Sequence, residues 1–286
     1  MTNATLKRVN AQLLKQQRGA IRRQQTLSGG SICQSFKLET DRGQRYFVKT
    51  HARPAPQFFE AEAQGLTALA ANTRLRTPAI IAVDQHYLLL EYIDAGQPAG
   101  DYWQTLAAGL AELHGQAQPY FGFTADNFCG STPQPNPETA DGYQFFADSR
   151  LRYQADLATD GGLLSANDRA ALETLIDQLP SLLPRQAPSL IHGDLWSGNI
   201  YCDSRRQPVL IDPACHYGWR EADIAMTCLF GALPQPFYDS YNAILPLEAG
   251  WRERLPLYNL YHLLNHLNLF GDSYLAGIRA TVKRFV

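Results

Sequence analysis

The segment from Leu190 to Ala214, LIHGDLWSGNIYCDSRRQPVLIDPA, constrains this chain more than any other. Two short apolar runs, at 200–202 and 209–211, flank a hydrophilic stretch, and this pattern predicts a β-hairpin. Such a hairpin carries Asn199 at its entry and Asp212 at its exit, so both side chains lie at the same end. Asp194 stands in the loop just before it. The spacing therefore predicts that three oxygen-bearing side chains converge.

These residue types meet two needs of phosphoryl transfer. The reaction requires a carboxylate near the acceptor hydroxyl and oxygen ligands that hold Mg²⁺ against the phosphates. We expect Asp194 to accept the hydroxyl proton, and Asn199 and Asp212 to bind Mg²⁺ through hard oxygen atoms. Each residue by itself is also typical of a turn or a local cap. The joint spacing favours the catalytic interpretation, because the kinase catalytic loop has the same Asp-x-x-x-x-Asn interval.

The first 95 residues are predicted to form a small lobe that is mostly sheet. A helix is expected over residues 1–25, and period-two patterns predict strands in 26–40 and 45–51. A helix with prolines at its start is expected over 55–72, followed by further strands at 79–83 and 87–93. We therefore expect a five-stranded sheet, the N-terminal helix and one inserted helix.

Residues 96–286 are predicted to form a larger, mainly helical lobe. Apolar residues recur every three to four positions in five segments, at 101–114, 143–158, 167–183, 220–231 and 255–270. The loop over 121–139 is too long to be only a connector, so it is expected to be functional or mobile. The fold class expected is thus α+β with two lobes.

Charge and cysteine content exclude several classes of protein. The chain of 286 residues has 25 basic and 27 acidic side chains, so nothing in its overall charge favours nucleic acid or a membrane as partner. Five cysteines without a Cys-x-x-Cys pair argue against a disulfide framework and a structural zinc site. No apolar run approaches the length of a membrane span or a secretory signal. We expect a cytoplasmic protein, and its oligomeric state stays open.

Longer motifs around the hairpin resemble a known family. HGDLWSGN followed by IDPA is similar to the aminoglycoside-phosphotransferase-like branch of the kinase superfamily, in which His-Gly-Asp stands for His-Arg-Asp. The insert Trp196-Ser197-Gly198, with YGWREADIAMTCLFG downstream, more narrowly resembles the fructosamine kinase, or ketosamine 3-kinase, family. The similarity extends from about Ser28 to the end. It implies a two-lobed protein-kinase-like fold, with a nucleotide-binding lobe over 1–95 and a catalytic, acceptor-binding lobe over 96–286, and ATP and Mg²⁺ as cofactors.

A second polar pair is predicted in the first lobe. Lys49 lies on a predicted strand, where an exposed edge lysine is the plain alternative. Glu62 follows Phe58 and precedes Leu66 by four residues each, which places it on the apolar stripe of its helix. A carboxylate on a buried face needs a cation, and Lys49 is the natural partner. The resemblance implies that this pair positions the α- and β-phosphates of ATP.

Two further nucleotide contacts are expected. A glycine-bearing bend can cover phosphates with backbone N–H groups, although a bend between strands is often only a turn and this one departs from a full G-x-G-x-x-G. The resemblance implies that the end of the fifth strand meets the adenine edge. The residues concerned are Gly29, Gly30 and Ser31 in the bend, and Glu91, Tyr92 and Ile93 at the strand end.

The acceptor side is less constrained by the sequence. Trp196, two residues after Asp194, is placed to stack on a sugar or amine, although a core aromatic is the alternative. His192 is expected to shape the catalytic loop and to lie near the substrate. Arg150 and Gln154 share a helix face at i, i+4 and are candidates for the acceptor site, with a solvated face as the equal alternative.

Other polar residues have structural interpretations. Asp223 either begins a helix or accepts hydrogen bonds from the catalytic-loop backbone and fixes it. His114, His262 and His266 lie among leucines at helical spacing, which favours packing or surface roles. Cys33 follows the glycine bend, and redox control through its thiol is a minor hypothesis.

The function expected is ATP-dependent phosphorylation of a small sugar-derived acceptor. The resemblance implies the 3-hydroxyl of a ribulosamine or fructosamine, free or on a glycated protein lysine. The alternatives are a kinase for another small alcohol, such as an aminoglycoside, a choline-like compound or a hexose, and a nucleotide-binding module without turnover. The complete set of Lys49, Glu62, Asp194, Asn199 and Asp212 argues against the module, since an inactive protein is free to lose some of them.

Overall fold

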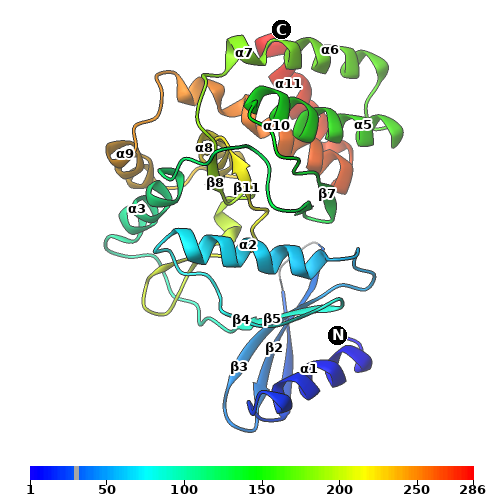
Figure 1. Cartoon of the computed structure of the whole chain (residues 1–286), viewed down its shortest axis with the longest axis vertical. Coiled ribbons are helices and arrows are strands. Elements are labelled where there is room, and N and C mark those ends of the chain that lie inside the picture. The colour runs from blue at the N-terminus through cyan, green and yellow to red at the C-terminus, as the bar shows by residue number, and fades with distance from the viewer. Residues whose placement is uncertain (29–31) are drawn as a thin grey trace.

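The computed structural model describes residues 1–28 and 32–286. The expected phosphate-covering bend at Gly29, Gly30 and Ser31 lies outside these residues. Figure 1 shows a sheet-rich N-terminal part at one end of the molecule and a helical C-terminal part at the other. The N-terminal part contains α1 (Asn3–Lys15), β1 (Ile21–Leu27), β2 (Gln34–Thr40), β3 (Arg45–Thr50), α2 (Phe58–Asn72), β4 (Ile80–Asp84) and β5 (Tyr87–Glu91).

The five strands form one antiparallel sheet in the order β1-β2-β3-β5-β4. Alternate residues of a strand face opposite sides, and both faces of this sheet are covered. Leu89 of β5 packs with Val9 and Leu13 of α1. Its neighbours Leu88 and Leu90 pack with residues of α2. The predicted five-stranded sheet with one inserted helix is thus present.

The first helix is shorter than expected from the sequence. It ends at Lys15, and β1 begins at Ile21 rather than after residue 25. Gln17 and Gly19 between them have φ of 57° and 91°, a left-handed conformation that ends a helix. The prediction of a helix up to residue 25 was wrong because β1 exposes nearly all its side chains and so lacks the apolar alternation of a half-buried strand.

The C-terminal part is mainly helical with short strand pairs. Its elements are α3 (Tyr102–His114), β6 (Asn127–Cys129), β7 (Thr132–Gln134), α4 (Gly142–Phe146), the π-helix η1 (Ala147–Arg152), α5 (Tyr153–Asp160), α6 (Ala166–Asp177), α7 (Leu179–Leu182), β8 (Ser189–Ile191), the 3₁₀-helix η2 (Ser197–Asn199), β9 (Ile200–Cys202), β10 (Pro208–Leu210), β11 (His216–Gly218), α8 (Arg220–Leu229), α9 (Gln235–Ile244), α10 (Trp251–Phe270), η3 (Asp272–Tyr274) and α11 (Leu275–Phe285).

Helix α10 is the centre of this part. Its leucines are buried against α5, α8 and α11, in a core that includes Leu257, Leu260, Leu264 and Leu267. A second core joins α3 and α9 to the catalytic segment through Leu195 and Ile224. The five helical segments predicted from the sequence are present, whereas α9, α11 and the pairs β6–β7 and β8–β11 were not foreseen. None of the helices in the described part of the chain has the length and apolar character needed to cross a membrane.

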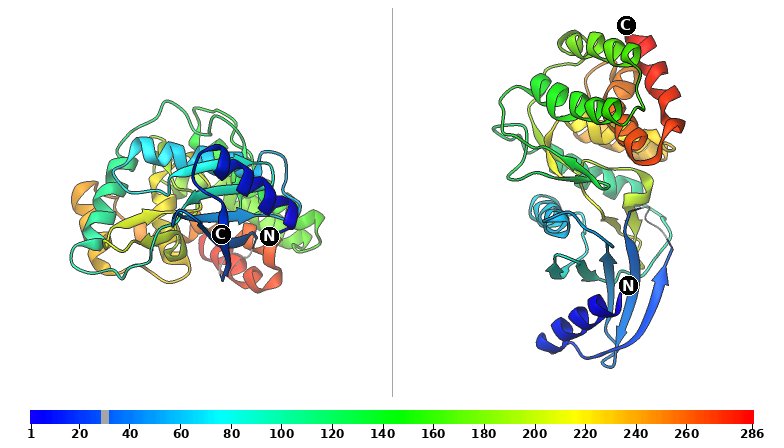
Figure 2. Two further views of the ribbon diagram at one scale, coloured as in Figure 1. Left: turned by 90° about the horizontal axis from the view of Figure 1, so that it is seen from below. Right: turned by 90° about the vertical axis from the view of Figure 1, so that its right-hand side faces the viewer.

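The two parts meet along the β9–β10 hairpin. Arg76, which precedes β4, forms a parallel bridge with Val209, and Ala95 pairs with Asp203. The Arg76 guanidinium also forms ion pairs with Glu91 on the sheet side and with Asp203 on the hairpin. Figure 2 shows the sheet and the helices stacked along the long axis, so the hairpin and catalytic loop lie at the junction between them.

Candidate active site

The catalytic loop is fixed by a buried carboxylate. Asp223, in the first turn of α8, accepts hydrogen bonds from the backbone N–H of His192 at 2.7 Å and of Gly193 at 2.9 Å. His114 of α3 contacts the same carboxylate through Nε2 at 3.2 Å. Burial by itself raises the pKa of Asp223, but these partners lower it below its usual value. The geometry therefore matches the interpretation in which Asp223 accepts hydrogen bonds from the backbone of the catalytic loop. His114 belongs to this hydrogen-bond network and does not merely fill space in the core.

Glycine is required between His192 and Asp194. Gly193 has φ of 80°, and a Cβ atom there would lie 2.1 Å from the carbonyl oxygen of Ala214. That distance is far shorter than Cβ contacts in real proteins. The neighbouring atom belongs to the backbone and cannot move aside as a flexible side chain would, so a residue with a Cβ does not fit here. The loop is thus pressed against the segment that follows β10, which brings Asp194 close to Asp212.

The predicted hairpin and convergence are present. β9 and β10 pair antiparallel, with Cys202 opposite Pro208. The Nδ2 group of Asn199 donates to the carbonyl oxygen of Asp194 at 2.8 Å and to Asp194 Oδ2 at 3.0 Å. Asp212 leaves the hairpin with φ of 54°, a left-handed conformation that aspartate adopts more readily than most residues. The three side chains lie together at one end of the hairpin.

Lys49 joins the two parts of the molecule at this point. Its Nζ lies 2.9 Å from both oxygens of Glu62 on α2 and 3.0 Å from Asp212 Oδ1. The side chains of Lys49 and Glu62 are 10% and 11% exposed, whereas that of Asp212 is 43% exposed. Burial alone lowers the pKa of the Lys49 ammonium, but Asp212 and Glu62 raise it above its ordinary value, so the ammonium stays charged. The predicted Lys49–Glu62 pair is confirmed as a contact.

Helix α2 is held where Glu62 meets Lys49. Gly65, one turn after Glu62, packs on the segment after Asp212. A Cβ at this position would lie 3.1 Å from Cγ of Pro213 and 3.6 Å from Sγ of Cys215. The glycine lets the helix approach closely. The elements that carry Glu62 and Asp212 are therefore packed directly against each other.

The environment of Asp194 favours the protonated carboxyl more than usual. Burial is the larger cause and the charge of Asp212 the next, and together they raise the pKa of Asp194 to about 7. A carboxylate with this pKa is matched to proton transfer near neutral pH. The pKa of Asp194 is therefore in the range that a general base requires.

A cleft runs between the sheet and the helices past these groups. Glu91, Tyr92 and Ile93 line it on the side of the sheet, as expected for a nucleotide end. Beyond Asp194 the lining becomes aromatic. The aromatic wall, as we call it, consists of Trp196, Phe230, His266, Phe270 and Tyr274. Trp196 therefore faces the cleft and not the core.

Three residues expected at the acceptor site are buried elsewhere. His192 is fully buried, and its ring forms hydrogen bonds with backbone: Nε2 lies 2.9 Å from the carbonyl oxygen of Ile211, and Nδ1 accepts from the N–H of Asp194. Arg150 donates to Asn136 and to the carbonyl oxygen of Pro135, which anchors the loop after β7. Gln154 contacts Asn265 and Asn268 of α10. These side chains support the site from behind, so placing them against the substrate was wrong.

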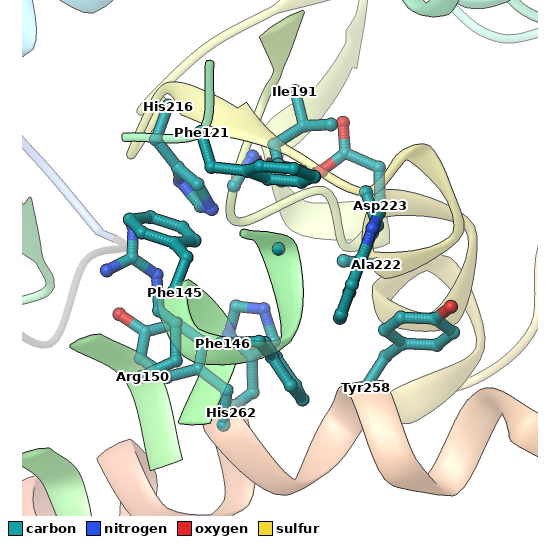
Figure 3. Close-up of a pocket in the computed structure, with 15 residues that line it drawn as sticks. Phe121, Phe145, Phe146, Arg150, Ile191, His216, Ala222, Asp223, Tyr258 and His262 are labelled. Carbon is teal, nitrogen blue, oxygen red and sulfur yellow. Dashed lines mark hydrogen bonds between the residues drawn. The ribbon is translucent and has the colours of Figure 1, made fainter. Parts of the chain in front are cut away.

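His262, for which the sequence favoured a packing or surface role, lies beside Asp194. His262 of α10 is 4% exposed, and its Nδ1 lies 3.9 Å from Asp194 Oδ1. Burial lowers the pKa of His262 to about 3, so the imidazole is neutral. Figure 3 shows His262 on the wall of a small interior pocket that Arg150, His216 and Phe145 also line. The signal in the sequence was a histidine at helical spacing among leucines, which predicts burial but not the partner.

Cys33 does not have the character of a reactive thiol. It lies in the cleft near Lys49, but burial raises the pKa of its thiol to about 11. A reactive cysteine requires a lowered pKa, because the thiolate is the nucleophile. Redox control through Cys33 remains a minor hypothesis.

Comparison with known proteins identifies the family. The family model described as fructosamine kinase matches residues 1–286, the whole chain. The chain belongs to the fructosamine kinase family. A protein of Synechocystis sp. named as a ketoamine kinase is 44% identical over 92% of this chain and 90% of its own length. The chloroplastic protein-ribulosamine 3-kinase of Arabidopsis thaliana is 38% identical over 91% of this chain and 82% of its own.

Solved structures confirm the fold of this fructosamine kinase family member. A crystal structure of a fructosamine-3-kinase from Thermobifida fusca superposes with a TM-score of 0.88, at 32% identity and over 96% of this chain and 97% of the other. An aminoglycoside phosphotransferase with bound ADP has a TM-score of 0.67 at 15% identity, which shows the fold alone. The predicted two-lobed protein-kinase-like fold and the family resemblance are both confirmed. The division between residues 95 and 96 stays a prediction.

Proposed function

We propose that this chain is an ATP-dependent kinase that phosphorylates a sugar hydroxyl of ketosamines, of the ribulosamine or fructosamine 3-kinase type, and so acts in the deglycation of amines or proteins. One observation carries the proposal. Asp194, a carboxylate bound to Asn199, lies in the same cleft as the Lys49–Asp212 pair. The names of the Synechocystis and Arabidopsis relatives support the ketosamine as acceptor.

The nucleotide is proposed to bind at the sheet side of the cleft. Lys49, held by Glu62, supplies a fixed positive charge for the α- and β-phosphates. Its charge persists because two carboxylates stabilise it. Glu91, Tyr92 and Ile93 supply the strand end whose backbone meets the adenine edge, and Gly29, Gly30 and Ser31 are proposed to cover the phosphates.

The residues at the hairpin fit Mg²⁺. Asp212 offers a carboxylate that is 43% exposed to the cleft. Asn199 uses its Nδ2 group on Asp194, which leaves its carbonyl oxygen as a ligand. An oxygen-only donor set with room for water is the kind that Mg²⁺ prefers. When bound, the metal neutralises charge on the phosphates.

Asp194 is proposed to position the acceptor hydroxyl and accept its proton. The hydroxyl oxygen attacks the γ-phosphorus, the bond from that phosphorus to the bridging oxygen of ADP breaks, and the hydroxyl proton passes to Asp194. Asn199 orients the carboxylate through Oδ2, which leaves Oδ1 available. Asp223 holds the loop that carries Asp194.

The aromatic wall is proposed to bind the rest of the acceptor. With one hydroxyl within about 3 Å of Asp194, the sugar lies against Trp196 and the amine substituent points out of the cleft. An indole can stack on the C–H face of a sugar and lie near a protonated secondary amine. Because the substituent projects outward, both a small amine and a glycated lysine side chain are expected to be accepted.

Replacing Trp196 with alanine tests this arrangement. We expect the KM for a ketosamine to rise by about fivefold or more, which corresponds to about 1 kcal/mol, while the KM for ATP changes little. Steady-state kinetics with each substrate varied in turn provide the measurement. Trp103→Ala, on α3 and outside the lining of the cleft, is the matched control. Equal effects on both KM values would contradict the role of Trp196.

The function itself is tested by the mass of the products. The purified protein is given ATP, Mg²⁺ and either a ribulosamine or a fructosamine, and we expect the sugar product to gain one phosphoryl group. A parallel panel contains an aminoglycoside, choline and a hexose. Phosphorylation of one of these without any ketosamine would establish the other small-alcohol kinase instead. ATP binding with no turnover of any acceptor would establish the nucleotide-binding module.

A further inference from the structure

A cluster of three metal-ligating side chains lies beside the proposed phosphoryl-transfer site. One ligand atom from each of Cys129, Asp194 and His262 lies within 4.8 Å of the other two. The residues come from β6, the catalytic loop and α10. Cys129 and Asp194 line the cleft, so a small ion can reach the cluster from solvent. Nothing in the proposed reaction uses Cys129 or His262.

His262 provides an independent sign that a ligand belongs here. Its Nδ1 is buried, lies 3.9 Å from Asp194 Oδ1, and has no hydrogen-bond partner among residues 1–28 and 32–286. The side chain is 5% exposed. A buried polar atom without a partner is uncommon, because it loses its bond to water and gains none in return. The orphaned nitrogen lies beside Asp194 Oδ1 in this cluster, so a cation or water bound there would satisfy it.

We propose that Cys129, Asp194 and His262 form an inhibitory site for Zn²⁺. Thiolate sulfur, imidazole nitrogen and carboxylate oxygen are the donors that Zn²⁺ takes in proteins, whereas Mg²⁺ takes oxygen. Three protein ligands leave the fourth tetrahedral position for a water on the cleft side. The sulfur and nitrogen ligands therefore favour Zn²⁺ over the Mg²⁺ that a kinase requires.

Charge and distance both permit the ion. Zn²⁺ with one thiolate, one carboxylate and a neutral imidazole has no net charge, which suits a buried site. The thiol proton of Cys129 is released to solvent as the metal binds. With Zn–N and Zn–O bonds of about 2.0–2.2 Å, tetrahedral ligand atoms lie about 3.4 Å apart. The 3.9 Å between His262 Nδ1 and Asp194 Oδ1 thus has to close by about half an ångström. The pairs with Cys129 lie within 4.8 Å and have to close by at most about 1.2 Å.

The zinc site and the proposed Mg²⁺ site use different atoms. Asp194 turns Oδ2 to Asn199 and Oδ1 to His262. Zinc on Oδ1 leaves Asn199 and Asp212 in place for the nucleotide metal, but it removes the oxygen proposed to accept the hydroxyl proton. Inhibition is therefore expected to be competitive with the ketosamine and insensitive to Mg·ATP, a consequence that rests on the proposed function.

Metal binding is tested first, without any reaction. The full-length protein without Mg²⁺ is titrated with Co²⁺, a spectroscopic substitute for zinc, and we expect one equivalent to produce a thiolate-to-metal absorption band. Cys129→Ser should abolish the band, and Cys33→Ser, the matched control at the second cysteine of the cleft lining, should retain it. Absence of the band in the unmodified protein, or its loss in Cys33→Ser instead, would overturn the site.

A second measurement uses the unmodified protein, so its result does not depend on whether a variant folds. X-ray absorption at the zinc edge of the one-to-one complex should show one sulfur ligand at about 2.3 Å with nitrogen or oxygen ligands at about 2.0–2.2 Å. The same spectrum from Cys33→Ser should be unchanged. A coordination shell of oxygen and nitrogen alone would show that zinc occupies the Asn199–Asp212 position and would refute the proposal.

Inhibition is tested second, against whichever acceptor the protein phosphorylates. Each variant is compared with its own rate without zinc, at constant excess Mg²⁺. Cys129→Ser and His262→Gln should each raise the zinc concentration for half-inhibition by about tenfold or more, because hydroxyl and amide groups are poor zinc ligands. If Mg·ATP rather than the acceptor relieved the inhibition by zinc, zinc would not compete with the acceptor as proposed. Zinc binding without any kinase activity would leave the site standing and overturn the proposed function alone.

Discussion

Replacing Asp194 with asparagine is expected to lower the turnover of a ketosamine by a factor of roughly 10² to 10⁴, the range for the loss of a general base. Asparagine keeps the shape and an oxygen that accepts from Asn199, but it cannot take up the hydroxyl proton. ATP binding should stay close to normal, because Lys49 and Asp212 are unchanged. The measurement is steady-state turnover with saturating substrates, together with calorimetric ATP binding.

The control is the same chemical change at the exposed Asp160 of α5, which should leave turnover unaltered. Unchanged turnover in Asp194→Asn would remove Asp194 from the mechanism. Loss of ATP binding together with turnover would instead show that the substitution damages the nucleotide site.

The pH profile supplies a second expected result for the same residue. The carboxyl must lose its proton before it can accept one, and its pKa in the free protein is raised to about 7. The kcat/KM for the ketosamine should therefore rise with pH along an acidic limb, because Asp194 must lose its proton before it can accept that of the hydroxyl. The residual activity of Asp194→Asn should lack this limb. A limb that persists would assign the titration to another group.

Replacing Asp212 with asparagine is expected to weaken Mg²⁺-dependent ATP binding and to lower turnover by a factor on the order of 10² to 10³, since a metal that loses its anionic ligand forfeits several kcal/mol of charge stabilisation. The asparagine side chain also tolerates the left-handed backbone, with φ of 54°, so the fold of the segment is kept. Titration of ATP binding with Mg²⁺ provides the measurement.

Asp94→Asn is the control for this experiment. Asp94 lies near the strand end of the cleft and pairs with Arg45 in an exposed contact that contributes little to stability. Its metal titration should match that of the unmodified protein. If the titration of Asp212→Asn also matched, Asp212 would not be a metal ligand.

The parts of the site that sequence reasoning found are those set by short-range geometry. The interval from Asp194 to Asn199 and the length of the hairpin fix where Asp212 returns, because a hairpin brings its two ends together. Glu62 was found for a similar reason, since helix periodicity places it on the buried face. Local periods predict such side-chain positions without knowledge of the rest of the fold.

The errors have local causes too. Arg150 lies in a π-helix, Ala147–Arg152. Its extra residue per turn means that side chains four positions apart no longer point in the same direction. Arg150 and Gln154 were assigned a common face from i, i+4 spacing, yet both turn into the core behind the cleft. Side chains of this length can be buried when backbone carbonyls and amides accept their hydrogen bonds.

His262 and His114 could not be assigned from sequence because their contacts join distant segments. Each lies on a helix with apolar neighbours, where periodicity predicts burial but not the partner. His262 meets Asp194 only because α10 lies against the catalytic loop, and His114 meets Asp223 only because α3 and α8 share a core. Tertiary packing decides such pairs.

The close packing of Gly65 on Pro213 and Cys215 has a consequence for regulation. In many protein kinases the helix that supplies the glutamate swings outward to switch the enzyme off. Here that helix rests on the very segment that delivers Asp212, with a glycine at the contact, so an outward swing would have to break a packed interface. The packing of α2 on this segment therefore keeps Glu62 and Asp212 together around Lys49. A substitution of Gly65 by a larger residue would push α2 away from Pro213 and so separate Glu62 from Asp212.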